Sequence, residues 1–453
     1  MKLIEKFKNS SKDDKNIIIN VAGAFFIKGL SLIISLLLTP AYIKFFNDEV
    51  ALGLWFTVNS VLAWILNFDL GIGNGLRNHL TRTYTEGNLE ESKKYLSSAY
   101  ISVGFVCLVV SIIFMFSFKF INWNMVFNIE KNIVSTNALL IAVLIVFIGI
   151  LMQLFLKLIN SVLYAIQKSS INNFLTFSTS IITLICVLLI PSRDNDTNLI
   201  NMAFIHIAAV NVPLIIATII IFTKTSLKRC LPSIKLFSKK HAKEVLSLGG
   251  IFLFVQIEYM VIMSTNEILI TWFASNEAVV EYQLYYKPFS MAGTLFALAL
   301  TPIWSAVTKA FTENNFKWIS NLYKKLFILS IIGTAACFIV IPILQIFMDI
   351  WLGKGYLDVN YIYAIAFSIL SGLMMINSVL SAFANGIGEL KTQAIFFGIG
   401  SIVKIPIAYI FVVLFKSWIG VVWANIIALG LYCIVQPFVF KKNLNKKIEE
   451  NYN

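Results

Sequence analysis

The chain has 453 residues, of which 58% are hydrophobic and only 13% charged, and its mean hydropathy is +0.82. Soluble globular domains carry about 25% charged residues, so this chain has too little charge to cover a compact fold with a polar surface. The composition therefore excludes a soluble globular protein and indicates an integral membrane protein. The net charge of +13 lies in loops between apolar segments, which favours membrane topology over nucleic-acid binding.

Twelve apolar runs are long enough to cross a membrane, because a helix of about 20 residues spans the hydrocarbon core. The first run follows a polar, basic start and is too long for the core of a signal peptide, so we expect it to remain as a membrane helix. The runs begin near Ile17, Val50, Ala99, Ala138, Ile171, Leu199, Val245, Val280, Leu326, Tyr361, Thr392 and Trp418.

The basic residues alternate between the two sides of such a twelve-helix chain. Of the 36 Lys and Arg residues, 26 lie in segments on the side of the N-terminus, six lie on the opposite side, and four fall within helices. Positively charged loops stay in the cytoplasm. The distribution therefore predicts that both termini are cytoplasmic.

The longest basic loop, residues 224–243, lies at the midpoint and predicts a division into two lobes. The N-lobe would be residues 1–223 with helices one to six, and the C-lobe residues 244–453 with helices seven to twelve. Six is an even number, so both halves have the same orientation and are related by a pseudo-two-fold axis along the membrane normal. We therefore predict an all-α fold with a substrate path between the lobes. Four residues of each half match at a constant offset of 227 positions: Thr85, Glu86, Asn88 and Leu89, and Thr312, Glu313, Asn315 and Phe316.

Charged residues within the helices mark a candidate site, since each costs about 2.5–3.5 kcal/mol at the membrane centre unless it faces water or a partner. Lys28, Glu258 and Lys404 lie at one depth near the midplane, and Glu267 and Lys287 lie nearer the outer face. We expect Lys28, Lys287, Glu258 and Lys404 to bind substrate in a wet cationic cavity, with ion coupling through Glu258 or Glu267. The alternative is two structural ion pairs, Lys28–Glu258 and Glu267–Lys287.

Catalytic and metal-binding motifs are missing from the sequence. The five cysteines lie far apart, with no CxxC and no nearby histidine, so neither a zinc site nor a disulfide framework is expected. The run GIGNG (residues 71–75) superficially resembles a phosphate-binding loop, but we expect it to close a membrane helix. We predict a protein that is not an enzyme and that uses no cofactor beyond a coupling ion, H⁺ or Na⁺.

Three stretches resemble a known family. FDLGIGNGLRNHLTRTYTEGNLEESKKYLSSAY (residues 68–100) is similar to the end of helix two and the following loop of Wzx-type polysaccharide flippases, in the MATE-like MOP exporter superfamily. YYKPFSMAGTLFALALTPIWSAVTKAF (residues 285–311) and ANGIGELKTQ (residues 384–393) resemble its second half. The resemblance implies that Asp69, Asn74 and Arg77 lie at the cytoplasmic mouth, where they gate or orient the lobes. Alternatively, they cap helix two and add positive charge.

The resemblance also implies a function in the bacterial inner membrane. Such a flippase moves oligosaccharide repeat units, carried on undecaprenyl diphosphate, from the cytoplasmic to the periplasmic leaflet by alternating access. The units enter the O-antigen of lipopolysaccharide or another surface polysaccharide, and a polymerase and a chain-length regulator are possible partners. The alternatives are an ion-coupled multidrug-type exporter and, less favoured, a polysaccharide polymerase or ligase, which tends to have a large periplasmic loop.

Overall fold

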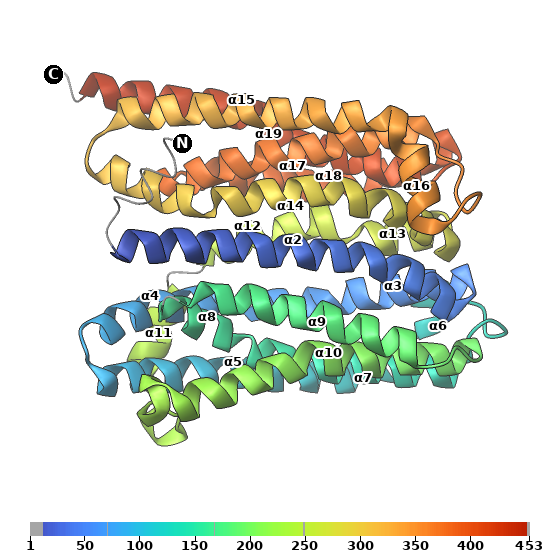
Figure 1. Ribbon diagram of the computed structural model, residues 1–453, viewed down its shortest axis with the longest axis horizontal. Coiled ribbons are helices and arrows are strands. Elements are labelled where there is room, and N and C mark those ends of the chain that lie inside the picture. Colours follow the sequence, from blue (N-terminus) through green and yellow to red (C-terminus); the bar gives the residue numbers. More distant parts are fainter. Residues whose placement is uncertain (1–11, 70, 167, 248–249, 451–453) are drawn as a thin grey trace. The chain divides into compact units, whose positions relative to one another are not determined.

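The computed structural model describes residues 12–69, 71–166, 168–247 and 250–450, and this part of the chain contains helices and no strand (Figure 1). The main-chain packing divides the protein into two compact units. Unit 1 comprises Met1–Phe46, Ile65–Trp123 and Ser135–Gly250, and unit 2 comprises Asn47–Trp64, Asn124–Val134 and Ile251–Asn453.

Unit 1 is a bundle of long helices followed by a short basic segment. Within it, α10 lies beside α7 and α9, and α2 runs along α9 (Figure 1). Its helices are α2 (Lys12–Phe46), α4 (Ile72–Thr85), α5 (Leu89–Phe118), α7 (Thr136–Leu156), α8 (Leu158–Ala165), α9 (Ser169–Leu189), α10 (Asn195–Lys224) and α11 (Lys239–Ser247), with the 3₁₀ turns η2 (Ser226–Arg229) and η3 (Ile234–Leu236) before α11.

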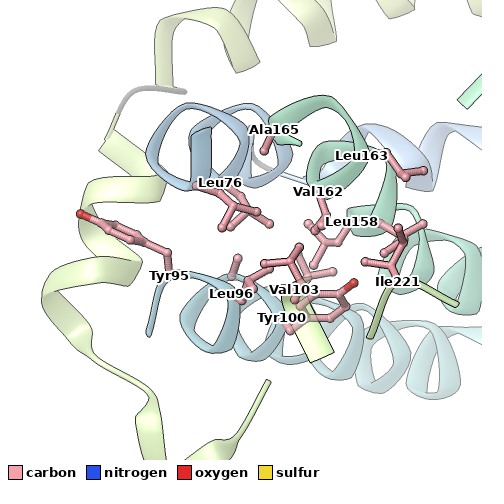
Figure 2. Packing of buried hydrophobic residues seen from close by; sticks show 14 of the residues in the cluster. Leu76, Tyr95, Leu96, Tyr100, Val103, Leu158, Val162, Leu163, Ala165 and Ile221 are labelled. Atoms are coloured by element: carbon pink, nitrogen blue, oxygen red, sulfur yellow. The ribbon is translucent and has the colours of Figure 1, made fainter. Parts of the chain in front are cut away.

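One apolar cluster joins α4, α5, α8, α10 and α11 of unit 1. Leu76, Leu96, Val162 and Ile221 are almost fully buried in it, and Figure 2 shows these side chains converging. Val245 brings α11 into the same cluster. Because lipid is as apolar as these side chains, close packing and not exclusion from water holds such helices together within the membrane.

Unit 2 contains the chain from Ile251 onward together with two segments from the first half. Within it, α14 packs on α3 and α17, and α18 packs on α19. Its elements are α3 (Glu49–Ala63), α12 (Gly250–Ser264), α13 (Asn266–Phe273), α14 (Asn276–Thr312), α15 (Phe316–Val340), η4 (Ile341–Ile343), α16 (Leu344–Leu352), α17 (Tyr361–Ile387), α18 (Lys391–Phe415) and α19 (Ile419–Glu450). The 3₁₀ turn η1 (Trp64–Asp69) and the short α6 (Trp123–Val126) lie at the borders of the two units.

The helices are suited to a membrane. Among the described residues, ten helical segments are long and apolar enough to cross it, and the bent pair α12 and α13 makes an eleventh if it counts as one span. The predicted eighth crossing corresponds to α14, which has 37 residues and lies outside this set. Large apolar side chains such as Phe116 and Phe438 are 74% and 73% exposed, as expected where lipid is the solvent.

The matching segments of the two halves form the same turn. Gly87 and Asn314, 227 positions apart, both have a left-handed main chain, with φ of 71° and 56°. The next residues, Asn88 and Asn315, each donate a main-chain hydrogen bond to the carbonyl five positions earlier, at 2.9 and 2.8 Å. Each then caps the following helix, α5 or α15, through its side chain. The shared geometry supports an internal duplication.

The two units do not coincide with the predicted lobes. The segment from Asn47 to Trp64, with α3, and the segment from Asn124 to Val134 group with unit 2, although they come from the first half of the chain. The basic segment of residues 224–243 belongs to unit 1, where α11 packs on α4 and α5. The division into residues 1–223, 224–243 and 244–453 stays a prediction.

Candidate functional site

A break in the seventh predicted crossing creates a polar site inside unit 2. The helix α12 ends at Ser264, α13 begins at Asn266, and the two are bent by 42°. The last carbonyl groups of a helix have no partner within it. The break therefore exposes main-chain oxygens in an apolar surrounding, where they need donors from elsewhere.

Lys404 of α18 supplies the donor at this break. Its side chain is fully buried, at 0% exposure. The ammonium group lies within hydrogen-bonding distance of four neutral oxygens. These are the carbonyl oxygens of Val261 and Ile262, at 3.2 and 2.5 Å, the Thr265 hydroxyl at 2.8 Å, and Asn266 Oδ1 at 2.7 Å. The negative end of the α12 dipole points at the same charge.

Glu267 provides the nearby counter-charge. Its carboxylate accepts hydrogen bonds from Ser60 Oγ at 3.0 Å and from Gln283 Nε2 at 2.8 Å. It also interacts electrostatically with Lys404. The residue is 8% exposed, so the buried ammonium and the buried carboxylate compensate one another across the break.

Glu258 lies about two turns before the break on α12 and is 6% exposed. A Cβ added at Gly398 of α18 would lie 2.6 Å from Glu258 Oε1, so the absence of a side chain there makes room for the carboxylate. Its other oxygen, Oε2, has no hydrogen-bond partner among the described residues. A buried carboxylate in this state is suited to take up a proton or a cation.

For the other predicted site residues, the structure describes fewer side-chain contacts. The ammonium of Lys287, on α14, lies 5.6 Å from the centre of the Phe56 ring, close enough for a cation–π interaction. Lys28, Asp69 and Asn74 belong to α2, η1 and α4, but their side chains lie outside the described residues. The roles of these residues in substrate binding and gating stay predictions.

The GIGNG run was expected to close a membrane helix, but in the structure it lies at the start of one. Gly71 has φ of 71° and stands at the N-terminus of α4, so the run opens a second helical segment after the 3₁₀ turn η1. The left-handed main chain at this point favours glycine. Further along α4, the exposed guanidinium of Arg77 stacks on the Tyr164 ring, 4.7 Å from its centre.

A polar cluster that was not predicted from the sequence fixes α11 in unit 1. His241 Nε2 lies 2.7 Å from Glu91 Oε1, and the Tyr95 hydroxyl donates a hydrogen bond to Glu244. This hydrogen bond holds the pKa of Glu244 below its usual range. The His79 ring stacks on Tyr95 with 4.6 Å between centres. A short amphipathic pattern, KKHAKEVLS, begins at the end of the basic loop and is a local signal for this helix.

The tyrosines of the predicted eighth crossing lie inside the protein. Tyr282 and Tyr285 are both fully buried, and the Tyr282 hydroxyl accepts a hydrogen bond from the Asn266 amide at 2.9 Å. The Tyr285 hydroxyl accepts one from the main-chain nitrogen of Asn360 at 2.7 Å. Tyr282 therefore supports the first residue of α13, and Tyr285 supports the start of α17.

Comparison with known sequences gives one informative relative, and no family model matches the chain. A protein of Yersinia pseudotuberculosis named "Putative O-antigen export protein" is 22% identical over 383 residues, which cover 78% of this chain and 82% of that protein. The 383 aligned residues extend far beyond the three stretches that resemble the flippase family.

Solved structures with a similar fold are MATE transporters. An inward-facing multidrug resistance MATE family transporter of the MOP superfamily superimposes with a TM-score of 0.68 and 15% identity, covering 93% of this chain and 96% of that one. An outward-facing transporter gives 0.62 and 15%, with 95% and 96% covered. A MATE protein in the bent conformation gives 0.64 and 15%, with 98% of each chain covered. This chain is therefore a multi-pass membrane protein with the fold of the MATE transporters of the MOP superfamily.

Proposed function

We propose that this protein is a flippase that moves undecaprenyl-diphosphate-linked oligosaccharide repeat units from the inner to the outer leaflet of the bacterial inner membrane. It would act by alternating access and supply units for O-antigen or another surface polysaccharide. The observation that carries the proposal is the similarity to a protein named for O-antigen export over 78% of the chain, on a transporter fold. It is a transporter in this proposal and not an enzyme.

The buried charges of unit 2 support a transport role. A static membrane bundle gains little from ionisable groups in its interior, because each is costly to desolvate. Glu258, Glu267, Lys287 and Lys404 nevertheless lie within the membrane helices of this unit. We propose that Lys28 and Lys287 attract the diphosphate and that Glu258 couples transport to an H⁺ or Na⁺ gradient, with Asp69, Asn74 and Arg77 at the cytoplasmic mouth.

The proposal includes the membrane topology. Both termini would face the cytoplasm, because 26 Lys and Arg residues fall on that side of the chain and six on the other. The halves on either side of residues 224–243 would form the two lobes that rock about the substrate path. A polysaccharide polymerase and a chain-length regulator would receive the flipped units.

The decisive experiment is a chromosomal deletion complemented by the wild-type gene or by variants. We expect the deletion strain to lose surface glycan and to accumulate lipid-linked repeat units on the cytoplasmic leaflet. Lys28→Ala and Lys287→Ala should each fail to restore the glycan while their protein levels stay normal. Full restoration by both variants would contradict the cationic site.

Multidrug export is the alternative, because the solved structures of similar fold are multidrug transporters. In that case the deletion strain would become hypersensitive to drugs with no surface-glycan defect. A purified protein that joined repeat units in the absence of a polymerase would instead favour an enzyme.

A further inference from the structure

We propose that the break between α12 and α13 is a binding site for a small monovalent cation, and that the ammonium group of Lys404 is its permanent occupant. The site is built within unit 2 from one turn of α12, the residue at the break and the first residue of α13. The site consists only of residues of this chain, and its assignment does not depend on which cargo the protein carries.

The ligand set is that of an alkali cation. Two main-chain carbonyls, a hydroxyl and an amide oxygen all lie within 3.2 Å of one nitrogen. A lysine ammonium has only three protons to donate, so the four acceptors outnumber its donors, and the Val261 carbonyl also accepts a hydrogen bond from the Thr265 hydroxyl at 2.7 Å. A surplus of convergent oxygens at the C-terminal end of a half-helix is the arrangement by which membrane transporters hold Na⁺.

The charges around the site favour a single positive charge. None of the four contacting oxygens belongs to a carboxylate, and the counter-charge comes from Glu267, which interacts with Lys404 through space. Hard divalent cations are usually bound directly by carboxylates. One carboxylate outside the contact shell and one helix dipole balance a monovalent ion.

The lysine is fixed in place by close packing of its helix. A Cβ added at Gly400 of α18 would lie 2.6 Å from the carbonyl oxygen of Ala428 and 3.1 Å from Ile262 Cδ1. The glycine thus lets α18 approach both α12 and α19, and one turn later Lys404 reaches the break. Because this amine is covalently attached, it cannot leave the break during a transport cycle, and a coupling cation would have to bind elsewhere, as at Glu258.

Removing the tether should turn the break into a site for free cations. In full-length Lys404→Ala in detergent, with N-methyl-D-glucamine as the only cation, we expect a melting temperature about 5 °C below that of the wild type. Adding NaCl or methylammonium chloride should recover at least half of that loss. The wild type should respond equally to these salts and to N-methyl-D-glucamine chloride at the same ionic strength.

Lys404→Met is the matched control, because it fills the same space without a charge. It should melt lower than the wild type and show no recovery specific to Na⁺ or methylammonium. In Lys404→Ala/Thr265→Val, which removes one ligand, the cation concentration for half-recovery should rise about tenfold, the equivalent of one lost hydrogen bond.

Three results would overturn the proposal. The first is Lys404→Ala with wild-type stability in N-methyl-D-glucamine, and the second is an equal response of the Ala and Met variants to Na⁺ and methylammonium. The third is a Lys404→Ala protein that stays unfolded in every cation. Recovery of folded Lys404→Ala only from membranes solubilised in Na⁺ or methylammonium, with folded Lys404→Met under no such requirement, would support it.

Discussion

Gly75 of α4 packs directly against the main chain of Val245 in α11, so closely that an added Cβ would lie 2.1 Å from the Val245 carbonyl oxygen. The two residues belong to the same unit and the same apolar region, which seats α11 on the membrane helices. Gly75, the last glycine of the GIGNG run, therefore has a packing role that any larger side chain would disturb.

Gly75→Ala should displace α11 and lower stability by about 1–3 kcal/mol, the usual cost of forcing atoms into a packed interface. The measurement is the melting temperature together with the rate of tryptic cleavage at Lys239 and Lys240. Gly29→Ala is the control, because a Cβ there meets nothing within 4 Å and alanine favours the helix. Equal stability of the two variants would contradict the packing role.

His241→Ala should loosen α11 by removing the hydrogen bond to Glu91. Amide exchange over residues 239–247 should then become about three- to tenfold faster, the equivalent of one hydrogen bond. Hydrogen–deuterium exchange in detergent measures this directly. Unchanged exchange in α11 would show that its packing on α4 suffices, and His206→Ala, on α10, serves as a control for a histidine outside the cluster.

The Tyr95–Glu244 hydrogen bond predicts a pH dependence of the same helix. Because Tyr95 stabilises the ionised carboxylate and lowers its pKa, this contribution is fully present above the usual glutamate range. It is lost as the pH falls through the lowered pKa. The protection factors of the α11 amides, which are corrected for the slower intrinsic exchange in acid, should therefore fall on acidification to about pH 3 more in the wild type than in Tyr95→Phe. The same acid response in both proteins would argue against this pair.

Asn88→Ala and Asn315→Ala should each destabilise the protein by about 1 kcal/mol, since each removes the side-chain cap of a long helix. Similar losses are expected, because the two residues occupy equivalent turns. Asn→Asp at either position keeps the acceptor oxygen and should retain most of the stability. Thermal unfolding of the four variants tests the equivalence, and a large cost at one position alone would contradict it.

Glu258→Gln should make transport in proteoliposomes insensitive to a pH gradient, because it replaces the buried carboxylate with a group that cannot ionise. Glu267→Gln is the comparison: its carboxylate is already held by Ser60 and Gln283, so we expect the pH response to persist. A normal pH response in Glu258→Gln would remove this residue from ion coupling.

Much of the fold could be predicted from the sequence. Long apolar runs indicate which segments lie in lipid, and the alternation of basic loops indicates the topology. Both signals act on each segment separately, and the predicted crossings lie on helices in the part of the chain that the structure describes. The repeat at an offset of 227 was also readable, because a left-handed residue followed by a capping asparagine is a local feature of the chain. The expectation that the GIGNG run closes a helix was wrong, since a glycine such as Gly71 can stand at either end of a helix.

The partners of the buried charges depended on tertiary structure. The positions of Lys404 and Glu267 along their predicted helices placed both residues within the membrane. A position along a helix does not indicate the direction in which the side chain points. That direction follows from helix rotation and from close approaches such as the one at Gly400. The sequence by itself thus determined that the chain spans a membrane and carries costly charges. Only the packed helices decided that the Lys404 ammonium meets the open end of α12, because hydrogen bonds form between atoms about 3 Å apart and hydropathy acts over whole segments.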